Sequence, residues 1–377
     1  MTTLPMLRIA AGEQDRRDCP FVVACPAEVP ESVHWLADEA TGQRIPAQVT
    51  DGSLWAVLDN LPSGGTRTYR LLLDEPPSGG LRLAQSPEQF DLAIDGAPFT
   101  SYRFGSSEVR PYFYPLVGPS AAAMTRNYPM RNVEGESTDH PHHRSLYIAF
   151  GDVNGVDVWS EPPHPNTGRI VHRAWNKVTP GTVVVALDES LQWVDGHDRS
   201  LLDERRQIRA YGTKVARILD LDLTFSPSSV AVLFGDTKEG GPLAVRVATP
   251  LEGKNGGLIE NAQGGRREAE TWGKRSPWVD YSGTIGQESV GIALMDHPTS
   301  FRHPTRWHVR DYGLFAANPF GLSAFTNDPS QRGDYLLEPN RSIQFHYRVV
   351  LHRGDAAAGR IAAYYQDFAQ PPALSWE

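Results

Sequence analysis

Hydrophobic and polar residues alternate along much of this chain with a period of two. Residues 214–225, KVARILDLDLTF, place apolar side chains at alternate positions against a face that carries Asp220 and Asp222. Residues 342–352, SIQFHYRVVLH, alternate in the same way. Because successive side chains of a strand point to opposite faces, this pattern predicts half-buried antiparallel strands.

Other segments are continuously apolar, such as residues 182–187, TVVVAL, and residues 290–295, VGIALM. Such runs are typical of strands that are covered on both faces. One helix is predicted, over residues 355–369, with Asp355 as its N-cap and proline after its end. The sequence therefore predicts an all-β fold with one C-terminal helix.

A stretch rich in Pro, Gly and Ser at residues 75–89 predicts a domain boundary. Residues 1–85 then form a small N-terminal β-sandwich, and residues 86–377 form a large antiparallel β-sandwich that carries the site. Two domains suit a chain of 377 residues, because single cores stop growing at about 250–300 residues.

The formal net charge is −9, and the basic residues are scattered. This argues against nucleic acid or an anionic membrane as a partner, since both need a concentrated basic surface. No apolar run reaches the roughly 18–20 residues that cross a bilayer, and no signal peptide is evident. Cys19 and Cys25 lie too far apart on one strand to bridge. Reduced thiols favour a cytoplasmic location, and the sequence leaves a homo-oligomer open.

Six of the twelve histidines fall in two short segments. These are His140, His142 and His143 within residues 138–159, and His297, His303 and His308 within residues 295–313. Each segment contains Asp-His-Pro, in which the proline is expected to hold the preceding histidine extended at a strand end. Imidazole exchanges protons near neutral pH, and an adjacent carboxylate fixes its tautomer.

A glycine-rich turn in residues 234–247, FGDTKEGGPLAVRV, carries two carboxylates and a lysine. We expect Glu239 to act as acid or base opposite a histidine, and Asp236 and Arg246 to bind hydroxyl groups. Polar-tipped aromatic residues near the histidines suit a sugar, because their rings pack on C–H faces while charged neighbours bind hydroxyls.

The predicted catalytic residues are His140, His142, His143 and Glu239. The predicted substrate-binding residues are Asp139, Arg144, Asp236, Lys238, Arg246, His297, His303, Trp159 and Tyr112. No cofactor or metal is expected, although the i, i+2 spacing of His140 and His142 would place two imidazoles on one face of a strand and keeps a metal-dependent enzyme as an alternative. No GxSxG elbow, phosphate-binding GxxxxGK[ST] or GxGxxG motif is present.

Several blocks resemble an uncharacterised bacterial family often labelled PmoA-like, over roughly residues 90–355. They read RPYFYPL, DHPHHRSLYIAFGDVNGVDVW, FGDTKEGGPLAVRV, WVDYSG, GIALMDHPTSFRHPTRWHVRDYGLFAANPFG and LEPNRSIQFHYRVVLHRGD. The label implies a methane-oxidising membrane subunit, which a sequence without a membrane span contradicts. Members of the family look associated with sugar catabolism.

The block LEPNRSIQFHYRVVLH also resembles the closing strand of galactose-mutarotase-like supersandwich proteins, with Asn340 and Arg341 in place of the usual Gly-Glu. This resemblance implies a supersandwich and proton transfer by histidines and a carboxylate at the anomeric centre of a sugar. The histidine side would be His140, His142 or His143 together with His297, and Glu239 would be the carboxylate.

The sequence therefore predicts a carbohydrate-active enzyme that cleaves or isomerises a glycoside or modified sugar, of the hydrolase, lyase or epimerase type. Two alternatives stay open. One is a sugar-binding or regulatory β-sandwich without catalysis, and the other is a metal-dependent sugar hydrolase or lyase that uses the same histidines.

Overall fold

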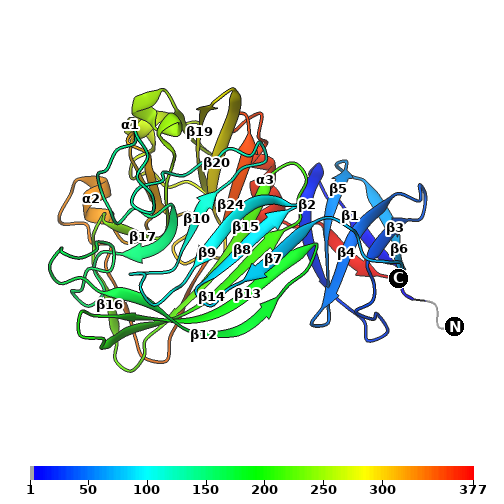
Figure 1. Ribbon diagram of the computed structural model, residues 1–377, viewed down its shortest axis with the longest axis horizontal. Helices are drawn as coiled ribbons and strands as arrows, with labels where there is room; N and C mark the ends of the chain where they lie inside the picture. The colour runs from blue at the N-terminus through cyan, green and yellow to red at the C-terminus, as the bar shows by residue number, and fades with distance from the viewer. Residues whose placement is uncertain (1–3) are drawn as a thin grey trace.

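The computed structural model describes residues 4–377, which form a small unit and a large unit side by side (Figure 1). The small unit is one seven-stranded antiparallel sheet that encloses its own apolar core. Its strands lie in the order β2 (Arg16–Ala24), β5 (Ser53–Leu61), β4 (Arg44–Thr50), β3 (Trp35–Asp38), β6 (Thr66–Leu72), β1 (Leu7–Ala10) and β25 (Ala373–Trp376).

The large unit contains two eight-stranded antiparallel sheets. The first sheet has the order β21 (Trp307–Val309), β22 (Leu314–Ala317), β17 (Gly240–Arg246), β11 (Leu146–Phe150), β10 (Tyr112–Leu116), β9 (Ala97–Arg103), β8 (Gln89–Ile94) and β7 (Leu81–Gln85). The second has the order β12 (Arg169–Thr179), β13 (Val184–Val194), β14 (Ser200–Tyr211), β15 (Arg217–Ser226), β24 (Ile343–Arg353), β20 (Glu288–Asp296), β19 (Trp278–Ile285) and β18 (Leu258–Asn261).

The remaining elements are short. A two-stranded ribbon pairs β16 (Val232–Phe234) with β23 (Tyr335–Leu337). The helices are α1 (Arg267–Thr271), α2 (Leu322–Thr326) and α3 (Ile361–Ala369), with two 3₁₀ turns at Thr249–Leu251 and Gly253–Asn255. In Figure 1, α1 and α2 lie at the end of the large unit that is remote from the small one.

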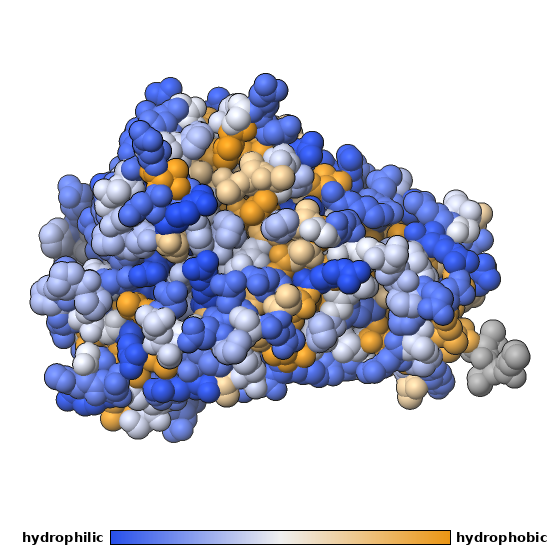
Figure 2. Space-filling model, in the orientation of Figure 1, coloured by the Kyte–Doolittle hydropathy of each residue, from blue (hydrophilic) through white to orange (hydrophobic). Residues whose placement is uncertain are grey.

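The main core lies between the two large sheets. Leu219, Leu221 and Leu223 of β15 pack there together with residues of the first sheet such as Phe113 and Val245. Burial of these alternate apolar side chains is the main driving force for the packing of the sheets. The surface is mostly hydrophilic on the face shown in Figure 2, where apolar residues appear only in small groups.

Helix α3 joins the two units. Its Ile361 and Tyr364 pack with Val350 of the second large sheet, and its Asp367 forms a buried ion pair with Arg16 of β2 at 2.9 Å. The C-terminal strand β25 then pairs with β1, and Figure 1 shows this red segment running into the blue small unit.

The all-β fold predicted from the pattern is confirmed, including the strands expected over residues 214–225 and 342–352. The C-terminal helix is shorter than expected, because it begins at Ile361 and Asp355 instead caps a preceding turn through the N–H of Ala358. The two units do not divide at residue 85. Strand β7, which precedes that residue, pairs with β8 in the large unit, and the last strand, β25, pairs with β1 in the small unit.

Both cysteines are free thiols, with Cys19 buried in the small unit. Within residues 4–377, no helix combines the length and the apolar character that crossing a bilayer requires.

Candidate functional site

The candidate site lies on the face of the first large sheet that points away from the main core. Neighbouring strands place one row of residues of this face directly opposite one another, from β10 to β21: Tyr112, Tyr147, Ala244, Ala316 and His308. Alternate residues of the same strands, such as Phe113 and Val245, belong to the core between the sheets. Ala244 and Ala316 therefore form a floor of small side chains, with larger ones on either side.

The Asp-His-Pro-His-His-Arg segment, residues 139–144, forms a turn that packs onto this floor. The ring of His143 lies 6.3 Å from that of Tyr147 and 5.5 Å from that of Trp159. The turn is closed by the N–H of His143, which donates to the carbonyl oxygen of His140 at 3.0 Å.

The expectation that Pro141 keeps His140 extended is wrong, because the φ angle of His140 is 45°. Proline disfavours the helical region for its predecessor, but tertiary contacts determine the conformation here. The carbonyl oxygen of His140 also accepts a hydrogen bond from Arg126 at 2.9 Å, so this carbonyl is held from two directions.

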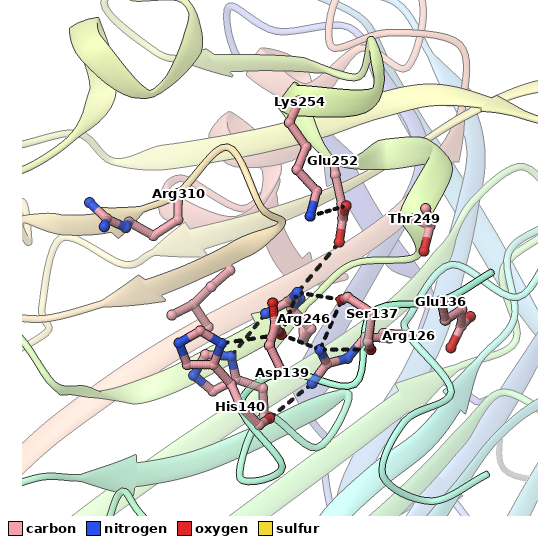
Figure 3. A network of polar contacts seen from close by, with 12 residues as sticks. Arg126, Glu136, Ser137, Asp139, His140, Arg246, Thr249, Glu252, Lys254 and Arg310 are labelled. Atoms are coloured by element: carbon pink, nitrogen blue, oxygen red, sulfur yellow. Dashed lines mark hydrogen bonds and ion pairs between the residues drawn. The ribbon is translucent and has the colours of Figure 1, made fainter. Parts of the chain in front are cut away.

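Asp139 lies between two buried arginines (Figure 3). Its carboxylate is 2.6 Å from Nη1 of Arg126 and 3.0 Å from Nη2 of Arg246, and it is 3.1 Å from Nδ1 of His140. Burial raises the pKa of Asp139, but the charge of Arg246 and the hydrogen bonds from His140 and Arg126 outweigh it and lower the pKa to about 2. Asp139 is therefore an ionised carboxylate that faces His140.

His143 is neutral and fixed in one tautomer. Its Nδ1 is 3.2 Å from Nη1 of Arg246, and since a guanidinium can only donate, Nδ1 accepts and the proton lies on Nε2. Burial, followed by the neighbouring charges of His142 and Arg246, holds the pKa of His143 well below its ordinary value. With 1% of its surface exposed, His143 supports the site from beneath.

Three rings stack in front of Arg246. His140 is parallel to His143, with 4.7 Å between ring centroids, and parallel to Tyr312, with 5.0 Å. The guanidinium of Arg246 lies 4.7 Å from the centroid of the Tyr312 ring. Arg246 also contacts Glu252 at 3.5 Å, as Figure 3 shows. The stack orients His140 with its other ring nitrogen away from Asp139.

Glu239 enters the site from the turn that precedes β17. Gly240 adopts a φ of 132°, and a Cβ at Gly241 would overlap the carbonyl oxygen of Ala317. Directly after Glu239, Gly240 therefore allows β17 to approach β11 closely and Gly241 allows it to approach β22. Glu239 forms an ion pair with Lys238 at 2.8 Å. Burial raises the pKa of Glu239, but Lys238 and then the nearby His308 lower it overall.

His308 faces Glu239 from the edge strand β21. Its Nδ1 is 2.8 Å from the carbonyl oxygen of Lys238, so Nδ1 carries the proton and Nε2 has a free lone pair. Burial lowers the pKa of His308 to about 4 despite the opposing charge of Glu239. Among residues 4–377, no side chain or backbone group forms a hydrogen bond with its buried Nε2.

These side chains form one cluster, here called the site ring. Its members are His142, His140, Tyr312, Arg310, Trp272, His308 and Glu239. The ring centroids of His140 and His142 are 5.8 Å apart. Arg310 lies over both Tyr312 and Trp272, at 5.6 Å and 5.1 Å, and Trp272 meets His308 edge to face at 4.8 Å.

His142 lies beside His140 and close enough to Glu239 for the carboxylate to act on its pKa. Burial, the charge of Arg110 and His140 lower its pKa to about 4, although Glu161 and Glu239 act in the opposite direction. Near neutral pH the site ring therefore contains an ionised Glu239 close to two neutral imidazoles, those of His142 and His308.

Three predicted substrate-binding residues lie beneath or beside the site ring. Trp159 and Tyr112 are each 1% exposed, so neither offers a ring face to a sugar. Arg144 lies over Tyr112 at 5.4 Å and binds both oxygens of Glu161, at 2.7 and 2.8 Å. These residues hold the segments that carry the site in place.

Asp236, His297 and His303 have other partners. The carboxylate of Asp236 accepts hydrogen bonds from Ser323 and from the N–H of Gly333, which joins two loops. His303 binds Asp296 at 2.9 Å. His297 packs edge to face on Phe368 of α3 and near His346 of β24, at the second large sheet.

The second Asp-His-Pro segment is therefore not brought together with the first. Within residues 295–313, it is His308 that reaches the site. It lies on β21, which begins ten residues after His297 and forms the edge of the first large sheet. The sequence pattern drew attention to His308 and to polar-tipped aromatic residues near the histidines, but it did not assign His308, Trp272 or Tyr312 to the site. Arg126, Glu252 and Arg310 carried no recognisable signal.

A metal site does not emerge from this geometry. Within residues 4–377, no group of three or more His, Cys, Asp or Glu side chains is arranged to hold a metal ion. The Nδ1 atoms of His143 and His308 are already engaged, with Arg246 and with the carbonyl oxygen of Lys238.

Comparison with solved structures finds distant similarity to glycoside hydrolases. The GH36 α-galactosidase AgaA of Geobacillus stearothermophilus is 12% identical, with a TM-score of 0.37 over 74% of this chain and 41% of that one. The α-galactosidase of Lactobacillus brevis is 10% identical, with a TM-score of 0.37 over 76% and 41% of the two chains. A glycosyl hydrolase family 38 protein of Enterococcus faecalis is 10% identical, with a TM-score of 0.41 over 100% and 47%.

The chain thus spans less than half the length of these structures. No curated protein matches the sequence. A family match covers residues 89–366. This range includes every member of the site ring and all strands of the two large sheets except β7. The chain belongs to this family, DUF6807, a family of unknown function.

Proposed function

We propose that the site ring binds a carbohydrate and acts on it by acid–base chemistry. The observation that carries the proposal is that an ionised carboxylate, Glu239, and two neutral histidines, His142 and His308, lie close enough for Glu239 to act on the pKa of each histidine and for each histidine to act on that of Glu239. Paired groups with different protonation states at one place are the usual requirement for proton transfer to and from a substrate.

The side chains of the site ring suit a polyhydroxylated ligand. Tyr312 and Trp272 are half-buried aromatic residues on which the apolar face of a sugar can pack. Arg310 and Lys238 are half-buried hydrogen-bond donors that can bind hydroxyl groups. Such alternation of aromatic and charged groups favours a sugar over an apolar or a nucleotide ligand.

The members of the site ring are assigned different roles. Glu239 is the general base, because its pKa is lowered and it is ionised near neutral pH. His140 is the acid partner: Nδ1 faces the Asp139 carboxylate at 3.1 Å, which orients its Nε2 toward the ligand side. His142 lies between the two and stays neutral, so it positions a hydroxyl group. His143 and Arg246 are positioning residues beneath them.

The reaction class is cleavage or isomerisation of a glycoside or modified sugar. In either case Glu239 removes a proton from a substrate hydroxyl or from water, and His140 returns a proton to the oxygen that gains electrons. The net proton count on the protein is then restored by exchange between the two groups and solvent.

The test is a panel of mono- and disaccharides, with binding measured by calorimetry and products by proton NMR. The wild type is expected to convert at least one sugar, and Glu239→Gln to convert it at least a hundredfold more slowly while still binding it. Glu288→Gln, at the exposed start of β20, is the matched control and should retain the wild-type rate.

A bell-shaped dependence of kcat/KM on pH is expected for this pair, and Glu239→Gln should remove its acidic limb. A sugar that binds with no turnover and no such pH dependence would instead identify a non-catalytic binding protein. Turnover that is unchanged in Glu239→Gln would refute the assigned base.

A further inference from the structure

A second cluster of charged residues lies outside the site ring. Four arginines, Arg275, Arg302, Arg306 and Arg332, line a cavity of about 200 Å³ next to the loop that begins α2. This volume is several times the roughly 30 Å³ that one water molecule occupies in the liquid, and it is smaller than the ~300–1,000 Å³ of typical drug-sized pockets. The cavity therefore has room for a small ion or for one functional group of a ligand.

Three of these guanidiniums have no carboxylate partner among the described residues. Arg275 donates to the carbonyl oxygens of Arg302 and Pro304. Arg302 donates to those of Pro319, Gly333 and Asp334, and Arg306 donates to that of Gly273. Only Arg332 forms an ion pair, with Asp334 at 2.8 Å. Backbone carbonyls satisfy hydrogen bonds without neutralising charge.

The charges are held together by the fold. Arg275 and Arg306 face each other across an isolated antiparallel bridge. The guanidinium of Arg302 lies between 5.1 and 5.5 Å from the ring centroids of Phe301, Phe320 and Tyr335, so it cannot turn away toward solvent.

Burial and then the charge of Arg275 lower the pKa of both Arg302 and Arg306. The Nε of Arg306 is buried, and among residues 4–377 it has no hydrogen-bond partner.

The acidic groups near the cavity do not balance this charge. Asp334 is paired with Arg332. Asp236 also acts on Arg302 and Arg332, and Asp152 acts on Arg332. These carboxylates therefore gather around Arg302 and Arg332, whereas the charge that acts on Arg306 is that of Arg275. Like charges held this close repel one another unless an anion lies between them. Guanidinium groups bind oxyanions with two parallel hydrogen bonds, which makes phosphate and sulfate groups their preferred anionic partners.

We propose that this arginine cavity is a binding site for a tetrahedral oxyanion, a phosphate or sulfate group, either free or as part of a small molecule. The site is separate from the site ring and does not depend on its function. It adjoins the ring through the backbone, because Arg306 directly precedes β21 and donates to the carbonyl oxygen of Gly273, the residue after Trp272.

The experiment is isothermal titration of the full chain with inorganic phosphate and with sulfate at constant ionic strength, maintained with potassium chloride. Saturable binding of one ion per chain is expected. Arg275→Gln and Arg306→Gln should each weaken binding at least tenfold, and Arg306→Lys should weaken it less because the charge is retained. Arg173→Gln, at an exposed position of β12, is the control and should bind as the wild type does.

Circular dichroism checks that each variant is folded. The absence of saturable binding to the wild type, or wild-type affinity in both Gln variants, would overturn the proposal. Glucose 6-phosphate and acetate are titrated into the full chain in the same way. Tighter binding of the ester identifies a phosphate carried by a larger ligand, equal binding identifies the free ion, and preferential binding of acetate contradicts the assigned class. Glu239→Gln should bind phosphate normally, which separates this result from any failure of the proposed enzymatic function.

Discussion

The Nδ1 atom of His308 lies 2.8 Å from the carbonyl oxygen of Lys238. This hydrogen bond joins the edge strand β21 to the turn that carries Glu239, although the two residues are far apart in the sequence. It also fixes the tautomer of His308, so that Nε2 rather than Nδ1 is the free nitrogen. One contact therefore sets both the position of the carboxylate and the hydrogen-bonding character of its neighbour.

Replacement of His308 by alanine should destabilise the fold. The change leaves the carbonyl oxygen of Lys238 without this partner and creates a cavity at a position that is 1% exposed, at a cost of about 3 kcal/mol. Urea unfolding followed by tryptophan fluorescence measures it. The control is His197→Ala, at an exposed position, which should change the free energy of unfolding by less than about 0.5 kcal/mol. Equal effects at the two positions would contradict the assigned contact.

Asp139 should contribute a stabilisation that disappears in acid. Its pKa is lowered from 3.8 to about 2, so the stabilisation is complete above pH 3.8 and is lost as the pH falls through about 2. The shift corresponds to roughly 2 kcal/mol. Because the side chain is 39% exposed, solvent screening reduces this to about 1 kcal/mol.

The measurement is the difference in free energy of unfolding between the wild type and Asp139→Asn from pH 2 to 7. A difference that stays constant down to pH 2 would show that ionisation of Asp139 is not its source.

His142 and His308 should remain neutral well below neutral pH. Burial lowers the pKa of each from 6.5 to about 4. Their ring carbon resonances in histidine-labelled protein should therefore not shift between pH 8 and 5.5, whereas in urea-unfolded protein they should titrate normally. Assignment comes from His142→Ala and His308→Ala spectra, and a midpoint near 6.5 for either residue in the folded state would contradict the burial argument.

The same shifts have a consequence for stability. Since the unfolded chain takes up protons on these histidines below pH 6.5 and the folded chain does not do so until about pH 4, the folded state should lose stability as the pH falls through this interval. Thermal unfolding of the wild type and of His142→Ala, compared at pH 7 and pH 5, checks the sign. The variant should lose less stability on acidification.

Gly241→Ala should displace the Glu239 turn. The added Cβ would overlap the carbonyl oxygen of Ala317, so β17 or β22 must shift, at a cost of about 1–3 kcal/mol. Gly286→Ala is a useful comparison, because a Cβ there meets no neighbouring atom and only the positive φ is strained. If the two changes affected both stability and sugar binding equally, close strand approach would not be what positions Glu239.

Arg206→Met should be among the most damaging single changes in the core. Arg206 is fully buried and donates to Glu204 at 2.7 Å and to the hydroxyl of Tyr102 at 2.8 Å. Removing one member of a buried pair leaves an uncompensated charge on the other, with a cost of about 3–5 kcal/mol. Arg206→Met/Glu204→Leu should recover part of this loss, as denaturant unfolding can show. A double variant less stable than the single one would contradict the pairing argument.

Much of the fold could be predicted from the sequence, because strand formation depends on a local period. The alternation of Leu219, Leu221 and Leu223 with polar residues is visible in the chain and corresponds to β15 as observed. The position of helix α3 was predicted, but its first residue was not. Whether Asp355 caps a helix or a turn depends on how the segment packs between the two units.

The candidate site was predictable only in part. The clustering of His140, His142 and Glu239 in polar, glycine-rich or proline-rich segments is a sequence signal. In the structure His140 and His142 lie side by side, and Glu239 acts on the pKa of His142. His297 shares its Asp-His-Pro context with His140 but lies at the second sheet instead. A local motif specifies a turn, whereas the sheet to which the turn belongs depends on strand pairing over long sequence separations.

By itself, then, the sequence determined the strand content and the residue types available for chemistry, because both follow from side-chain identity and local period. Only the tertiary structure decided which of those residues share a site and in which protonation state. Strand register placed Ala244, Ala316 and His308 in one row. Burial then lowered the histidine pKa values, and neither register nor burial is encoded within a single segment of chain.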